Sequence, residues 1–183
     1  SSGAAVAAEA TLRAPGRVGG LLLLDGDALN TGAGSRTPIG HVLIAPYRTS
    51  LLRLALRSDR LIRALYDAQC GPSCPRLDHA GVAVWRRPYQ VAGGESGMWG
   101  SLAAGNPGLP AARVARLYES GVPASVVFGA DDDLFSKDTP ARTAARTGAP
   151  PPTLIPGARH LTMISDPVAV ATAVTALAAR ARH

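Results

Sequence analysis

Carboxylate and imidazole side chains follow two successive apolar segments in the second half of the chain. The aspartates 131–133 come directly after the segment 124–128, and His160 comes shortly after the segment 153–155. A neutral imidazole takes a proton from a hydroxyl effectively when a carboxylate holds its other ring nitrogen and stabilises its cationic form. The spacing therefore predicts an acid–base pair in which one of these aspartates orients His160.

Ser1 is the candidate nucleophile for such a pair. A serine hydroxyl becomes reactive beside an imidazole when it stands on a sharp turn at the start of a helix, where backbone N–H groups can stabilise an oxyanion. Ser1 immediately precedes a run of small, helix-forming residues. A serine nucleophile with a histidine base predicts acyl transfer to water, and therefore hydrolysis of an ester, a thioester or an amide.

A serine at position 1 has a second interpretation. N-terminal-nucleophile hydrolases use the amine of their first residue as the base. Their fold stacks antiparallel sheets, whereas buried strands separated by helices are expected in this chain. We therefore favour the first interpretation.

Helical and strand patterns alternate at both ends of the chain. Strands are expected at 18–24, 124–128 and 153–155, and helices at 3–14, 111–120, 140–147 and from Pro167 to the C-terminus. Strands with few polar side chains are typical of a parallel sheet covered on both faces, and the intervening helices make the crossovers. The predicted fold class is therefore α/β. Because ligands and catalytic groups collect at the carboxyl ends of parallel strands, we expect the aspartates and His160 to meet there.

Residues 26–110 interrupt this alternation. They contain Gly/Pro-rich turns around one amphipathic helix, expected at 49–68. We interpret them as a mainly helical insert that forms a cap, while 1–25 and 111–183 form the core. Four side chains of the insert are the candidates for lining a substrate pocket: Trp85, Tyr89, Met98 and Trp99. An apolar roof with few charges facing inward would favour a small, hydrophobic substrate.

Four segments together resemble the α/β-hydrolase fold family. Ser1-Ser2-Gly3 and the small residues after it are similar to the end of a G-x-S-x-G nucleophile elbow and its helix. The segment 21–26 is similar to the strand that follows the elbow. The segments 126–132 and 156–161 are similar to the acid and histidine loops, in the family's order of Ser, Asp and His.

The resemblance implies a catalytic triad of Ser1, Asp132 and His160, with no cofactor and no metal ion. It also implies a partial sheet, formed by the last three parallel strands of the hydrolase fold with their crossover helices. The first glycine of the elbow and the strand before it are absent, so we expect the chain to begin inside a longer protein. The alternative function is a non-catalytic hydrolase-like module that binds a partner or ligand.

The identity of the acid is open among several aspartates. Asp132 is favoured because it stands three residues after Gly129, as in the G-x-x-D acid loop of the family. Asp131 and Asp133 are alternatives, although they could equally be solvated loop carboxylates. Asp25 ends the preceding strand, a position that some family members use for the acid instead.

The composition excludes several classes of protein. With 46% apolar and 17% charged residues, the 183-residue chain is globular, and its apolar runs are too short to cross a bilayer. The net charge of +6 comes from arginines scattered along the chain, with only 4% aromatic residues, which argues against nucleic-acid binding. Cys70 and Cys74 form either a local disulfide or two free thiols, and two cysteines alone do not predict a metal site.

Overall fold

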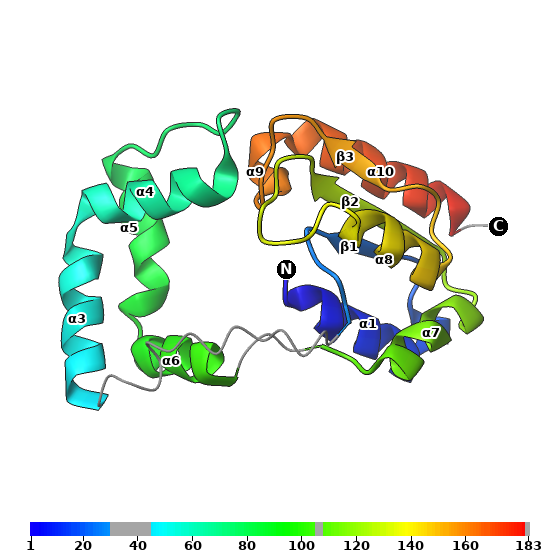
Figure 1. Cartoon of the computed structure of the whole chain (residues 1–183), viewed down its shortest axis with the longest axis horizontal. Coiled ribbons are helices and arrows are strands. Elements are labelled where there is room, and N and C mark those ends of the chain that lie inside the picture. The colour runs from blue at the N-terminus through cyan, green and yellow to red at the C-terminus, as the bar shows by residue number, and fades with distance from the viewer. Residues whose placement is uncertain (30–44, 105–107, 182–183) are drawn as a thin grey trace. The chain divides into compact units, whose positions relative to one another are not determined.

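The computed structural model describes residues 1–29, 45–104 and 108–181 (Figure 1). These residues form two compact units. The first, here called the core unit, contains the described residues of 1–31, 69–74 and 107–183. The second, here called the helical unit, contains the described residues of 32–68 and 75–106. Three parts of the predicted insert 26–110 therefore belong to the core unit: the described residues 26–29, 69–74 and 108–110.

A parallel three-stranded sheet lies at the centre of the core unit. Its strands β1 (Leu21–Leu24), β2 (Ala124–Gly129) and β3 (Thr153–Ile155) are paired in that order. The predicted α/β class with three parallel strands is thus confirmed. β1 begins three residues later than predicted, because residues 18–20 are irregular, with a bend at Gly19, and pairing with β2 starts at Leu21.

Helices cover both faces of this sheet, as the sequence predicts. The core unit contains α1 (Gly3–Arg13), α7 (Ala111–Glu119), α8 (Thr139–Thr147), α9 (Thr162–Ser165) and α10 (Pro167–Arg180). Leu21 and Leu23 face a cluster that includes side chains of α1, α7 and α8, whereas Leu22 and Leu24 pack with side chains of α10. Figure 1 shows this arrangement, with α10 and α8 on opposite sides of the strands. Apolar residues at every position of β1 are therefore needed, because both faces are covered.

The ends of the core helices follow local sequence signals. Asp166 accepts a hydrogen bond from the backbone N–H of Ala169 at 2.9 Å, so it caps α10 as predicted, with Pro167 in the first turn. α8 ends at Gly148, whose φ of +66° is in the left-handed region that favours glycine. Both helix ends therefore lie where signals from residues within a few positions predict them.

In the described residues, the helical unit contains α3 (Ala45–Arg57), α5 (His79–Arg86), the 3₁₀ turn η2 (Arg87–Tyr89) and α6 (Gly94–Ala104). It also contains α4 (Asp59–Cys70) except for the last two residues of that helix, which belong to the core unit. The prediction of a single helix at 49–68 is wrong, because the chain breaks at Ser58. The hydroxyl of Ser58 accepts a hydrogen bond from the N–H of Leu61 at 3.2 Å, which caps a new helix. Within the described residues, no helix is long and apolar enough to span a bilayer.

Candidate active site

Asp132 and His160 form a buried hydrogen-bonded pair at the carboxyl edge of the sheet. His160 Nδ1 lies 2.9 Å from Oδ2 of Asp132, and the two residues are 8% and 4% exposed. Oδ1 of Asp132 accepts a second bond from the N–H of Leu134 at 3.0 Å. Because a carboxylate oxygen accepts, Nδ1 donates, and Nε2 is left with a lone pair that can take a proton.

The other aspartates of the acid loop do not occupy this position. Asp131 and Asp133 are exposed, whereas Asp132 is buried between them. Asp25 is also buried, but its oxygens accept hydrogen bonds from Gly129 and Thr162. Of the four candidate acids, Asp132 is therefore the one hydrogen-bonded to His160.

Phe135, an aromatic residue of the acid loop, packs against the imidazole of His160. The ring of Phe135 stacks on the ring of His160, with centroids 5.9 Å apart and planes inclined by 28°. Phe135 also packs edge-to-face on Phe128 of β2, at a centroid distance of 5.4 Å. The histidine ring is thus packed against a side chain that is anchored in the core, a contact that the sequence analysis missed.

Ser1 lies near the same edge of the sheet. Its backbone nitrogen donates a hydrogen bond of 3.1 Å to the carbonyl of Leu24, the last residue of β1. Ser1 is exposed, and no hydrogen bond between its Oγ and His160 is found in the described part of the chain.

Two glycines permit the close approach of the segments around the pair. A Cβ on Gly129 would collide with the backbone oxygens of Ala158 and Arg159, so the acid loop passes directly against the histidine loop only without a side chain there. A Cβ on Gly26 would likewise collide with the carbonyl oxygen of Ser1. The site is therefore formed by backbone segments in van der Waals contact.

The end of α4 holds the histidine loop from the other side. The N–H of His160 donates to the carbonyl of Gln69 at 2.8 Å, and the N–H of Arg159 donates to the carbonyl of Cys70 at 3.4 Å. These carbonyls are at a helix C-terminus, where no intrahelical partner exists. Cys70 forms a disulfide with Cys74, which closes the following turn and resolves the alternative that the sequence left open. In the sequence, the short spacing of Cys70 and Cys74 was the one sign that this turn is held in place, and nothing in it indicated the contact with the histidine loop.

The structure of the chain is similar to solved structures of known proteins, and this similarity identifies its fold. No protein-family model and no curated protein sequence matches the chain. Solved structures do match: a lipase candidate from Acinetobacter baumannii AYE (TM-score 0.69, 11% identity), a membrane phospholipase A described as a bacterial virulence factor (0.68, 16%) and a thermophilic esterase (0.57, 17%). They cover 98%, 98% and 97% of this chain, respectively.

The chain has the α/β-hydrolase fold. It spans 58%, 55% and 63% of the lengths of those three proteins, so it corresponds to part of that fold. At these identities the comparison establishes the α/β-hydrolase architecture alone.

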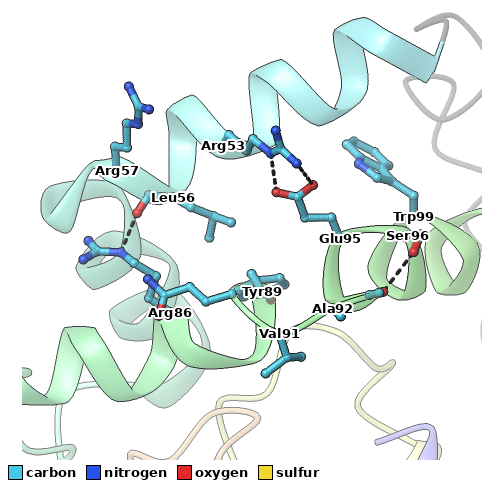
Figure 2. Close-up of a pocket in the computed structure, with 12 residues that line it drawn as sticks. Arg53, Leu56, Arg57, Arg86, Tyr89, Val91, Ala92, Glu95, Ser96 and Trp99 are labelled. Carbon is cyan, nitrogen blue, oxygen red and sulfur yellow. Dashed lines mark hydrogen bonds and ion pairs between the residues drawn. The ribbon is translucent and has the colours of Figure 1, made fainter.

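The helical unit contains a cavity of about 1040 Å³ between α3 and the segment of η2 and α6. Figure 2 shows Tyr89 and Trp99, two of the predicted substrate-binding residues, around this cavity. Trp85 instead packs edge-to-face on Tyr66, with centroids 5.3 Å apart. Met98 is not among the lining residues. The structure thus brings two of the four predicted side chains together.

Charged side chains also surround the cavity. Arg53 and Glu95 form a two-bonded ion pair at 2.7 and 3.0 Å, visible in Figure 2, and this pairing lowers the pKa of Glu95. Arg86 donates to the carbonyl of Leu56 at 2.6 Å. The lining is therefore mixed, more polar than the apolar roof expected from the sequence. Among the described residues, no cluster of histidine, cysteine, aspartate and glutamate side chains could hold a metal ion.

Proposed function

We propose that this chain carries the catalytic residues of a serine hydrolase that cleaves carboxylic esters, with Ser1 as nucleophile, Asp132 as acid and His160 as base. The observation that supports it most is the buried hydrogen bond between Asp132 and His160. The proximity of the Ser1 backbone to the same edge of the sheet adds to it. Further support comes from the neighbours in structure, which are described as lipases, an esterase and a thioesterase domain.

The proposed reaction proceeds through an acyl-enzyme. Nε2 of His160 takes the proton from Ser1 Oγ as that oxygen attacks the ester carbonyl carbon, while Asp132 stabilises the imidazolium. Collapse of the tetrahedral intermediate breaks the bond to the alcohol oxygen, which leaves with the proton from His160. A water molecule then attacks the acyl group with His160 as base again, releasing the acid and restoring Ser1. A thioester or an amide would follow the same steps.

We propose that the apolar part of a small-molecule substrate contacts Tyr89 and Trp99 in the cavity of the helical unit, which would then act as a cap. The indole Nε1 of Trp99 is buried and has no hydrogen-bond partner among the described residues. An oxygen atom of a bound ester could accept from it, which would remove the cost of that unsatisfied donor. Trp85, packed on Tyr66, would act through the shape of the cap, and Met98 would do the same, because neither side chain lines the cavity.

Labelling with a fluorophosphonate, which reacts with activated serines, tests the nucleophile. We expect the wild-type protein to label and Ser1→Ala not to label. His160→Gln should lower the turnover of a p-nitrophenyl ester by about 10³-fold or more. His79→Gln, an exposed histidine of the helical unit, is the matched control and should retain wild-type turnover. Labelling of Ser1→Ala at the wild-type level would refute the assignment, and an unreactive wild type would favour the non-catalytic alternative.

A chain-length series tests the cavity. If Trp99 contacts the substrate, Trp99→Ala should raise KM for p-nitrophenyl esters of longer acids more than KM for the acetate. An equal rise in KM for esters of all chain lengths would show that Trp99 does not contact the acyl chain of the substrate.

A further inference from the structure

Asp25 is a fully buried carboxylate that the proposed triad does not use. It follows the last residue of β1, and its residue exposure is 0%. Its φ of +45° lies in the left-handed region, which costs free energy for any residue with a Cβ, although aspartate tolerates it better than most. A buried charge-bearing group on a strained backbone persists only where its surroundings hold it in place, and such residues gather at functional sites.

The two oxygens of Asp25 bind donors from two different segments. Oδ1 accepts from the N–H of Gly129 at 3.0 Å, at the end of β2. Oδ2 accepts from the N–H of Thr162 at 3.2 Å and also from the hydroxyl of Thr162. Burial raises the pKa of Asp25, and these hydrogen bonds oppose the rise. The carboxylate is therefore satisfied by three donors in a place where an unpaired charge would be very costly.

The donors stand close in sequence to the two members of the buried pair. Gly129 is three residues before Asp132, and Thr162 is two residues after His160. Thr162 is itself fully buried and begins α9. The carboxylate of Asp25 thus connects the loop that carries the acid with the loop that carries the histidine, from a third segment of the chain.

We infer that Asp25 is a positioning residue, whose carboxylate fixes the histidine loop against the acid loop and thereby keeps Nδ1 of His160 on Oδ2 of Asp132. With its oxygens bound by Gly129 and Thr162, Asp25 is not the acid of the triad. The catalytic consequence rests on the proposed function, whereas the effect on the hydrogen bond between His160 and Asp132 does not depend on it.

The proton on Nδ1 of His160 gives a direct readout, because a proton in a His–Asp hydrogen bond resonates far downfield in the ¹H NMR spectrum. Asp25→Asn replaces one acceptor oxygen with an NH₂ donor, so either Gly129 or Thr162 loses its acceptor. We expect this variant to weaken or lose the downfield resonance, as Asp132→Asn must. Asp133→Asn removes an exposed charge from the same loop and should keep the resonance.

Substitution of Thr162, whose N–H and hydroxyl donate to Asp25, gives a second test that leaves the Asp25 carboxylate in place. Thr162→Val removes the hydroxyl donor and keeps the shape and the backbone N–H, whereas Thr162→Ser keeps the hydroxyl. We expect Thr162→Val to shift the resonance and Thr162→Ser to restore it. In ester hydrolysis, misplacement of the histidine should lower kcat by about 10- to 100-fold with little change in KM.

The outcomes separate this inference from the proposed function. If the wild type hydrolyses no ester, the proposed function fails, and the resonance alone decides the role of Asp25. If circular dichroism shows that Asp25→Asn does not fold, Thr162→Val and Thr162→Ser decide it. A wild-type resonance in the folded Asp25→Asn protein, or in Thr162→Val when Asp25→Asn does not fold, would overturn the inference.

Discussion

His160 and Asp132 are joined by a buried hydrogen bond of 2.9 Å although they are 28 positions apart in the chain. They follow adjacent strands of a parallel sheet, β2 and β3, whose carboxyl ends lie at one edge. The second oxygen of Asp132 is held by the N–H of Leu134, so the carboxylate cannot rotate freely. The pair therefore has one defined orientation, in which Nδ1 of His160 contacts Asp132 and Nε2 does not.

Loss of the carboxylate charge of Asp132 should abolish most of the proposed ester hydrolysis. In Asp132→Asn the amide can donate to Nδ1, which favours the wrong tautomer of His160, so we expect kcat to fall by about 10⁴-fold. The measurement is p-nitrophenyl ester hydrolysis at saturating substrate. Asp131→Asn, an exposed neighbour, is the control and should stay near the wild type. Comparable losses in both variants would contradict a specific role for Asp132.

A side chain at Gly129 should separate the acid and histidine loops. Gly129→Ala places a methyl group into the backbone oxygens of Ala158 and Arg159, so we expect the free energy of unfolding to fall by about 3 kcal/mol or more. Urea denaturation followed by circular dichroism measures this. Gly16→Ala is the control, because a Cβ there meets no atom within 4 Å, and its effect should be within about 0.5 kcal/mol. Equal stabilities of the two variants would contradict the close contact.

The disulfide should stabilise the turn that supports the histidine loop. Because Cys70 and Cys74 close a short loop, the double variant Cys70→Ala/Cys74→Ala should lose about 2 kcal/mol of unfolding free energy. Amide hydrogen exchange at Arg159 and His160 should also become faster, since their acceptors are in this segment. Reduction of the wild type should reproduce the change and leave the double variant unaffected. Unchanged exchange at His160 would show that the hydrogen bonds alone hold the loop.

The ion pair between α1 and α7 should make stability depend on acidic pH. Arg113, with a further contribution from Arg13, lowers the pKa of Glu9 from 4.5 to about 2. Between these values the unfolded chain binds more protons than the folded one, so this contribution is complete above about pH 4.5 and is lost as the pH falls toward 2. Glu9→Gln should therefore flatten the pH dependence of the unfolding free energy in that window. Glu119→Gln, an exposed control, should leave the wild-type slope unchanged.

Much of the fold was predictable because its signals are local. The cap of α10 at Asp166, the end of α8 at Gly148 and the apolar strands β2 and β3 depend on residues within a few positions of each other. The segment 49–68 forms parts of two helices and not the single helix expected, for a similarly local reason: Ser58 caps the second helix. The helical spacing of apolar residues continues across Ser58, but the Ser58 hydroxyl accepts a hydrogen bond from the N–H of Leu61 and so caps a new helix.

The amino-acid sequence by itself determined the three strands of the sheet, the order of α1, α7, α8 and α10 around them, and the presence of a serine, several aspartates and a histidine beside strand ends. Only the tertiary structure decided that Asp132 meets the imidazole, that Asp25 joins two loops, and that Cys70 pairs with Cys74. Propensity and capping act between neighbours in the chain. The bond between Asp25 and Thr162 spans 137 positions, so it exists only once three strands have paired and brought their ends together.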